Sequence, residues 1–405
     1  MTSPLEDLGY PLAFAVEAQA DDGRDGQTLG YPDPELGQSH RTRVRSLGGM
    51  QKEALVTSSL SGTTWRLVSD EGEYLQGDDV APAPLAHLTT GMISAFANEV
   101  LALARARDVT IHDLELVQDN YYTMNGSALR GTMTGGALPV ELRVDVDTDV
   151  DDDETRKLVS DALTASPVFG LLDGEHESKF RLVHNGRDIP VGSPSELDGP
   201  ALSDPKEAFE ELPRDAAERD PPVIHRTGHE TDPLPESDES YTSGEGSSLA
   251  SDQDRVLHLR GTCTLCENGE KHVEVELFSP IGTVFEFRSD EPEGYGGQGR
   301  APDAMTYVAA GIGFCFMTQM GRYADIVDAD LSAYRIVQDT HFSSGVAGGD
   351  HEERGRMNPV ETHAFVETAE NADFARELLE MSEQTCFLHA LAATDVGAPD
   401  VEFAE

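Results

Sequence analysis

Four cysteines are the residues of this chain whose type and spacing could support covalent chemistry. They are Cys263, Cys266, Cys315 and Cys386, all in the second half of a 405-residue sequence. Four thiols are too few for a disulfide scaffold, so in a reducing compartment we expect free thiols, metal ligands or catalytic residues. A thiolate near a positive charge can attack a peroxide, and the sulfenic acid that forms then condenses with a second thiol.

Cys315 and Cys386 are far apart in the sequence, and each lies in an apolar, helix-like context. If the two meet in space, one can act as the attacking thiolate and the other as its resolving partner. Buried free cysteines are also common as small core residues. Spacing alone leaves both interpretations open.

Cys263-Thr264-Leu265-Cys266 is a CxxC motif, which has three interpretations. It could be a local dithiol that passes electrons to Cys315 and Cys386, or half of a zinc site completed by His258 or His272. On a regular strand, however, residues three apart point to opposite faces, which favours one cysteine in the core and one at the surface. We expect no metal and no cofactor.

An internal duplication organises the elements that must position these thiols. Residues 51–171 align without a gap on residues 271–391, with 27 of 121 positions identical. In this alignment Cys315 corresponds to Ala95 and Cys386 to Ser166. The sequence therefore predicts two copies of one domain, of which only the second can perform thiol chemistry.

Both copies show the same order of apolar patterns. In the first copy we predict strands at 41–46, 53–58, 63–68, 114–122 and 140–147, with helices starting near Pro82 and Asp152. In the second copy we predict strands at 256–265, 272–278, 283–287, 331–339 and 360–367, with helices starting near Pro302 and Asp373. The order β-β-β-α-β-β-α predicts an α+β domain with an antiparallel sheet.

Composition shifts predict the domain boundaries. We expect a polar N-terminal extension at 1–36, a first domain without cysteines at 37–185, an acidic Pro- and Ser-rich linker at 186–253, and a thiol-bearing domain at 254–405.

The charge balance excludes several classes of partner. The sequence has 76 Asp+Glu against 29 Lys+Arg, a net charge of -47, and only five of the basic residues are lysines. Such a surface repels phosphate backbones and anionic lipids, so we expect no nucleic-acid or membrane partner. High acidity with scarce lysine is typical of a halophilic, salt-adapted soluble protein.

The uncharged segment 304–321 is diluted by polar residues and glycine, and it reads as a buried helix instead of a membrane span. The first residues lack a basic region followed by an apolar run, so we expect no signal peptide and a cytoplasmic location.

The run AAGIGFCFMT at residues 309–318, continuing to Tyr323-Ala324-Asp325, resembles the central helix of the OsmC/Ohr family of osmotically induced and organic hydroperoxide resistance proteins. A second cysteine like Cys386, on a following helix, is the other hallmark of that family. The resemblance covers most of residues 256–393 and, more weakly, 38–173. It implies two OsmC-like domains, each an antiparallel sheet with a long central helix, that form an intramolecular pseudo-dimer, with further homo-oligomers open.

The resemblance further implies that Cys315 attacks a hydroperoxide, that Cys386 resolves the product, and that a dithiol reductant restores the pair. The family's usual Glu before the first cysteine is replaced by Met305, with Asp303 the nearest acid. Its usual Arg is missing from the turn at 267–271, which leaves Arg260 and Arg322 as candidate cations in the same copy. Arg43 or Arg45 from the other copy is an alternative. We therefore expect thiol-dependent reduction of organic hydroperoxides in oxidative-stress protection. The alternative is a non-enzymatic protein of this fold that binds an apolar ligand or serves a structural role.

Overall fold

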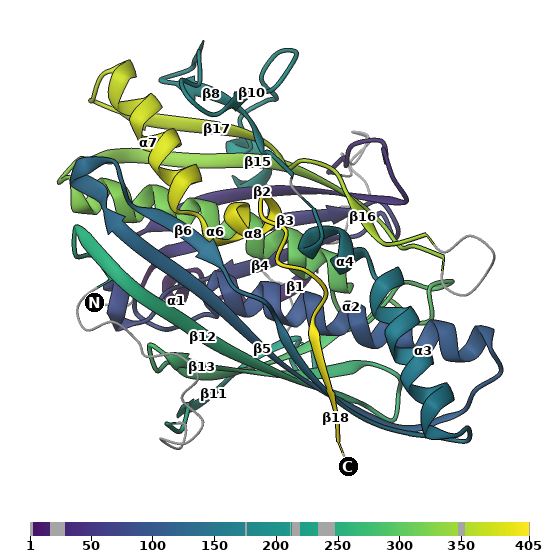
Figure 1. Ribbon diagram of the computed structural model, residues 1–405. Coiled ribbons are helices and arrows are strands. Elements are labelled where there is room, and N and C mark those ends of the chain that lie inside the picture. Colours follow the sequence, from purple (N-terminus) through teal and green to yellow (C-terminus); the bar gives the residue numbers. More distant parts are fainter. Residues whose placement is uncertain are drawn as a thin grey trace.

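The computed structural model describes residues 3–16, 29–174, 176–210, 212, 219–233, 248–346 and 353–404 (Figure 1). Parts of the expected N-terminal extension and of the expected linker fall outside these ranges. The described part of the extension contains α1 (Pro4–Leu8) and β1 (Ala13–Val16). The described part of the linker contains short strands and the helix α5 (Lys206–Glu210).

The first of two sheets combines strands from both halves of the chain. Its order within the described residues is β1, β4 (Thr64–Ser69), β3 (Gln51–Ser58), β2 (Gln38–Gly48), β15 (Leu331–Ser343), β17 (Glu361–Thr368), β8 (Lys179–His184) and β10 (Ser195–Glu196). Two short strands extend it, β16 (Arg356–Met357) on β15 and β9 (Arg187–Ile189) on β8.

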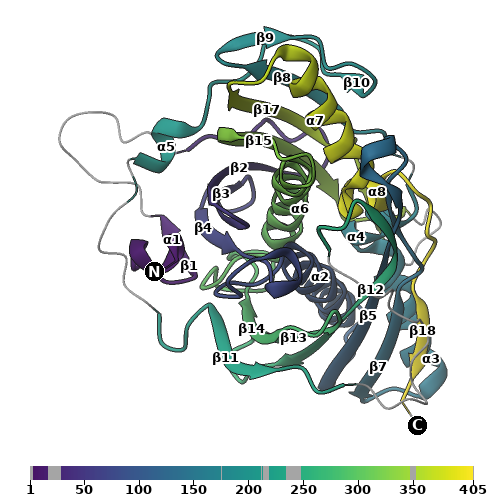
Figure 2. The same ribbon diagram turned by 90° about the vertical axis from the view of Figure 1, so that its left-hand side faces the viewer.

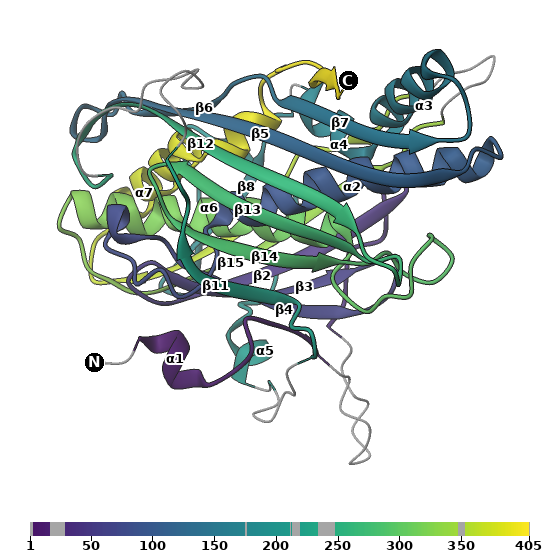
Figure 3. The same cartoon turned by 90° about the horizontal axis from the view of Figure 1, so that it is seen from below.

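The second sheet, seen from below in Figure 3, has the same mixed origin. Its order in the described chain is β11 (Ile224–Glu230), β14 (Thr283–Ser289), β13 (Lys271–Ser279), β12 (Asp252–Leu265), β5 (Ile111–Ser127), β7 (Glu141–Thr148) and β18 (Asp400–Phe403), with β6 (Thr134–Ala137) on β5.

The two halves exchange partners at the centre of each sheet. In the first sheet β2 pairs with β15, placing Arg41 opposite Asp339, and in the second β12 pairs with β5, placing Arg260 opposite Asp119. Each arginine donates two hydrogen bonds to the aspartate across from it, with Nε–Oδ1 distances of 2.8 Å for Arg41 and 2.9 Å for Arg260. Bidentate pairs of this kind fix the register between strands from different halves.

Two 23-residue helices fill the space between the sheets, and Figure 2 shows them end-on at the centre of the molecule. They are α2 (Pro84–Ala106) and α6 (Ala304–Ile326). Their backbones cross closely at two glycines: a Cβ on Gly91 would lie 2.6 Å from the Ala304 carbonyl oxygen, and one on Gly311 would lie 2.8 Å from the Leu88 nitrogen. Only glycine leaves room for this approach.

The remaining helices of the two halves are shorter than α2 and α6. They are α3 (Asp152–Ala165), α4 (Pro167–Leu172), α7 (Ala372–Thr385) and α8 (Phe387–Ala392), together with the 3-10 turns η1 (Glu73–Leu75) and η2 (Ala128–Arg130). Helix α6 begins after Asp303, whose Oδ1 accepts a hydrogen bond from the Thr306 amide at 2.7 Å, a favourable cap for the helix N-terminus.

The expected α+β class is confirmed, since the molecule combines sheets with packed helices. The sheets are largely antiparallel as expected, but β8 pairs in parallel with β17 and β10, and β18 pairs in parallel with β7. The 304–321 segment lies within α6, whose residues from Ala304 to Ala324 are all buried. The helix packs against α2, α7 and α8 and against strands of the first sheet. Among the described residues, none of the helices has the length and hydropathy needed to span a bilayer.

Candidate active site

The structure brings Cys315 and Cys386 together in the core. Cys315 lies in the middle of α6, and Cys386 is the extended residue at which α7 ends and α8 begins. Their sulfur atoms are 3.4 Å apart, and both side chains are buried. A disulfide bond is about 2.0 Å long, so these are two free thiols within hydrogen-bonding range and close enough to be joined by a small movement.

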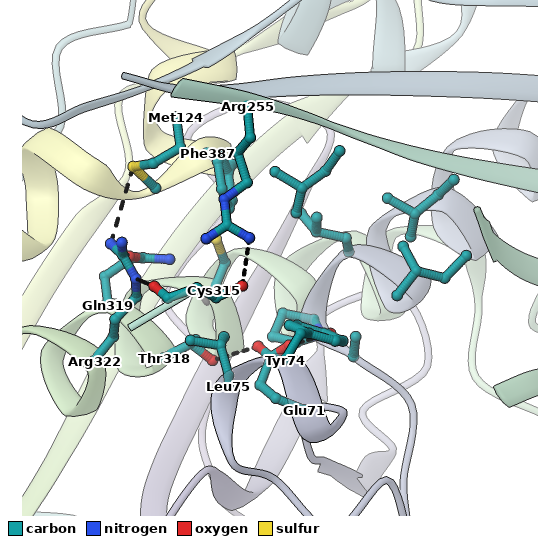
Figure 4. A pocket seen from close by; sticks show the side chains of 17 residues that line it. Glu71, Tyr74, Leu75, Met124, Arg255, Cys315, Thr318, Gln319, Arg322 and Phe387 are labelled. Carbon is teal, nitrogen blue, oxygen red and sulfur yellow. Dashed lines mark hydrogen bonds between the residues drawn. The ribbon is translucent and has the colours of Figure 1, made fainter. Parts of the chain in front are cut away.

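Cys315 lines a narrow pocket whose walls come from both halves of the chain (Figure 4). The first half contributes Leu75 and Met124, and the second contributes Leu257, Leu277 and Phe387. The cavity volume is about 40 Å³, enough for a very small group without rearrangement. An apolar pocket that ends at a thiol favours an apolar substrate with a small reactive head.

Two arginines lie in this pocket, Arg322 on α6 and Arg255 on β12. Arg322 donates from Nε to the Ser248 carbonyl oxygen at 2.8 Å, and its Nη1 contacts the sulfur of Met133 at 3.3 Å. Within the described residues, neither guanidinium has a carboxylate within ion-pair distance. Burial, with the nearby charge of Arg255, lowers the pKa of Arg322 to about 10, so it remains a cation at neutral pH.

One acid faces the same pocket. Glu71, which precedes η1, accepts hydrogen bonds from the Thr318 hydroxyl at 3.0 Å and from the Tyr74 hydroxyl at 2.7 Å. Burial raises the pKa of the Glu71 carboxyl, and the charge of Lys52 works in the opposite direction. The pocket therefore combines a thiol, two cations and a carboxyl at the junction of the two halves (Figure 4).

The two thiols have opposite tendencies to ionise. Burial raises the pKa of Cys315 well above its usual value, and the contact with Cys386 adds to this effect. Burial also opposes ionisation of Cys386, but the Cys315 thiol and His389 together hold the pKa of Cys386 well below its usual value. Within this coupled pair, Cys386 therefore gives up its proton more readily than Cys315.

His389 is the second polar neighbour of Cys386. It lies three residues further along, on α8, with Nδ1 3.1 Å from the Cys386 sulfur. Residues three apart share a helix face, so the fragment Cys386-Phe387-Leu388-His389 contains the signal for this contact. Sequence reasoning did not select His389, and it did not select Arg255 on β12. It also did not select Glu71, which reaches the site from the first half of the chain.

Other predicted site residues lie elsewhere. Arg260 is bound to Asp119 across the exchanged strands, and it does not line the pocket of Cys315. Asp303 caps α6 and contacts His40, whose Nε2 is 3.4 Å away. Met305 is the second residue of α6 and lines a separate cavity.

The CxxC cysteines point into different environments. Cys263 is buried on β12 between Leu116 and Val273, and burial raises the pKa of its thiol to about 12. Cys266 follows the end of β12 at the turn into β13 and is partly exposed; its sulfur accepts a hydrogen bond from Arg288 at 2.7 Å. This arrangement corresponds to one thiol in the core and one near the surface.

Comparisons with known proteins add one structural likeness. No family model matches the sequence, and no curated protein matches it. Among solved structures, the chain is similar to an OsmC-like hydroperoxide resistance protein from Jannaschia sp. CCS1, with 18% identity and a TM-score of 0.20. The match covers 32% of this chain and 79% of that chain. We therefore interpret the thiol pair from its own geometry.

Proposed function

We propose that this protein reduces organic hydroperoxides with Cys315 and Cys386 as a redox-active pair. The observation that carries the proposal is the 3.4 Å separation of the two sulfurs, of which the Cys315 sulfur belongs to a side chain lining an apolar pocket. The same pocket contains two arginines that have no carboxylate within ion-pair distance in the described chain. Two buried core cysteines that only pack would need neither the pocket nor the cations.

In the first step Cys315 gives up its proton, and the resulting thiolate attacks the outer oxygen of the hydroperoxide, so that the O–O bond breaks. The sulfur is oxidised to a sulfenic acid, and the peroxide is reduced by two electrons to an alkoxide. The proton that leaves Cys315 ends on the alkoxide, which departs as an alcohol. Arg322 and Arg255 favour this step because they stabilise negative charge developing on the sulfur and oxygen atoms.

In the second step the Cys386 thiolate attacks the Cys315 sulfur. A sulfur–sulfur bond forms, the sulfur–oxygen bond breaks, and hydroxide leaves with the negative charge of the Cys386 thiolate. An external dithiol then restores both thiols by disulfide exchange. The 3.4 Å distance means that this step needs little movement of α6 or α7.

The same proposal accounts for the architecture. We propose that the chain is a tandem OsmC-like protein whose halves form an intramolecular pseudo-dimer. The exchange of β2 and β12 between the halves supports it, as does the pocket of Cys315, which takes Glu71 and Leu75 from the first half. In this view the first half supplies part of the site although it has no cysteine.

The test is consumption of cumene hydroperoxide by the full chain with dithiothreitol or dihydrolipoamide as the electron donor. We expect turnover by the unchanged protein, none by Cys315→Ser, and a single equivalent consumed by Cys386→Ser in the absence of donor. Cys266→Ser is the matched control and is expected to keep full activity. Turnover that survives in Cys315→Ser would falsify the proposal, and so would the absence of turnover with every dithiol tried.

A further inference from the structure

His389 occupies a position for which the two-thiol mechanism alone gives no reason. Its side chain is 1% exposed, and Nδ1 lies 3.1 Å from the Cys386 sulfur. The matching position in the cysteine-free half, on the short helix that follows Ser166, is Phe169. His389 thus lies beside Cys386 in the second half of the chain. In the first half, Ser166 replaces the cysteine and Phe169 replaces the histidine.

The surroundings of the ring determine where its proton lies. Phe180 and Phe316 flank the imidazole, with ring centroids 5.7 Å and 5.1 Å away, and Nε2 has no hydrogen-bond partner within the described chain. A buried N–H without an acceptor is energetically costly, whereas a proton on Nδ1 points at the Cys386 sulfur. The favoured neutral tautomer therefore donates from Nδ1 to Cys386.

The charges around this ring are few. Helix α7 brings Glu383 near His389, and α6 brings Cys315. The neighbouring α4 and β6 carry no titratable side chain, and β8 presents Phe180. The Cys386 sulfur lies within hydrogen-bond distance of Nδ1, and His389 approaches it from outside the pocket that Cys315 lines.

We propose that His389 is a positioning residue that holds Cys386 as a thiolate aimed at the Cys315 sulfur, so that the sulfenic acid is resolved as soon as it forms. The inference rests on the proposed function. It assigns His389 to the second step alone: the Nδ1 proton stays on the ring, the electron pair of the Cys386 thiolate forms the sulfur–sulfur bond, and hydroxide leaves from Cys315. The first step, at the pocket side of Cys315, does not involve His389.

The experiment separates the two steps by mass spectrometry after one equivalent of cumene hydroperoxide, with dimedone present to trap sulfenic acid. The unchanged protein is expected to lose two protons through the Cys315–Cys386 disulfide and to carry little dimedone. His389→Phe, which copies Phe169, is expected to form the disulfide at least about tenfold more slowly and to accumulate the dimedone adduct on Cys315. His389→Gln retains a side-chain N–H donor and is expected to recover part of the disulfide rate.

A second measurement does not depend on peroxide chemistry. In a Cys315→Ser background, thiolate ultraviolet absorbance from Cys386 is expected near neutral pH and is expected to shift to higher pH when His389→Phe is added. A disulfide rate in His389→Phe equal to that of the unchanged protein, or an unshifted thiolate titration, overturns the role of His389. If Cys386→Ser never acquires dimedone on Cys315, the proposed function fails, while the thiolate titration still decides the role of His389.

Discussion

The pocket lined by Cys315 and the cavity at the equivalent position of the other half differ in their lining residues, volume and charge. The second cavity is lined by Ala95, Asn98, Glu99 and Ala102, which the internal duplication aligns with Cys315, Thr318, Gln319 and Arg322. Its acid is Glu291, which the same alignment matches to Glu71. The two cavities lie at equivalent positions of the aligned halves. The first has Cys315 and Arg322 where the second has Ala95 and Ala102.

The two cavities also differ in size and charge. The volume is about 40 Å³ beside Cys315 and about 780 Å³ in the second cavity. The first cavity is lined by two arginines and one acid, Glu71, whereas the second is lined by one arginine and two acids, Glu99 and Glu291. The proposed function therefore depends on features that the shared fold does not supply by itself, a small pocket and arginines near the thiol.

The strongest test of this difference transplants the thiols. In a Cys315→Ser background, Ala95→Cys with Ser166→Cys places two cysteines at the equivalent positions of the other half. We expect peroxide turnover to stay at least about 1000-fold below that of the unchanged protein, because the open cavity lacks the arginine that Ala102 replaces. Turnover is measured with cumene hydroperoxide and a dithiol. Recovery of substantial turnover would show that the fold alone activates the thiol.

The next prediction concerns the frame that both cavities share. Gly91→Ala and Gly311→Ala are each expected to reduce the free energy of unfolding by about 2 kcal/mol, because the new Cβ meets the backbone of the crossing helix. Chemical denaturation at fixed salt measures the change. Gly30→Ala is the control, since no atom lies within 4 Å of its Cβ position. A large effect at only one of the two crossing glycines would contradict the equivalence of the two helices.

A smaller effect is expected from the pocket cation. Arg322→Met keeps much of the side-chain volume and removes the charge, so the rate constant for oxidation of Cys315 is expected to fall roughly tenfold. Single-turnover kinetics with cumene hydroperoxide measure it. Ala102→Met, at the equivalent place in the second cavity, is expected to leave the rate unchanged. Equal rates for Arg322→Met and the unchanged protein would remove Arg322 from the mechanism.

The smallest expected effect is a pH dependence of stability from the second cavity. Burial, together with the charge of Asp303, raises the pKa of Glu291 from 4.5 to about 7. The folded state then binds more protons than the unfolded state between these values, so stability falls as pH rises through this window. Relative to the unchanged protein, Glu291→Gln is expected to gain about 1 kcal/mol between about pH 5 and pH 8. Denaturant titrations at both pH values measure it, with the exposed Glu293→Gln as a control expected to show no change.

Local patterns predicted the elements well, because strand alternation and helix capping depend on neighbouring residues. The predicted strand at 256–265 lies within β12, and the helix expected near Asp373 begins at Ala372. The nearness of Cys315 and Cys386 was expected from the family resemblance, since their spacing alone also allowed two separate core residues.

Contacts between the two halves of the chain could not be predicted from local sequence patterns. Arg260 was a candidate partner of the thiol, but the exchange of β12 places it opposite Asp119. The same exchange brings Arg255 and Glu71 to the pocket from segments with no local signal of chemistry. His389 was missed although its spacing from Cys386 was visible, because a single histidine on an apolar helix face is usually a core residue.

The pairing of β5 with β12 has a consequence for how the protein is made. Synthesis completes β5 at Ser127 well before β12 begins at Asp252, a gap of roughly 125 residues that takes on the order of 10 s at usual elongation rates. During that time the nascent first half presents one edge of its longest strand with no partner to cover it. Acidic side chains along β5 and β7, among them Asp113, Glu115 and Asp145, repel other chains from that edge until its own second half emerges.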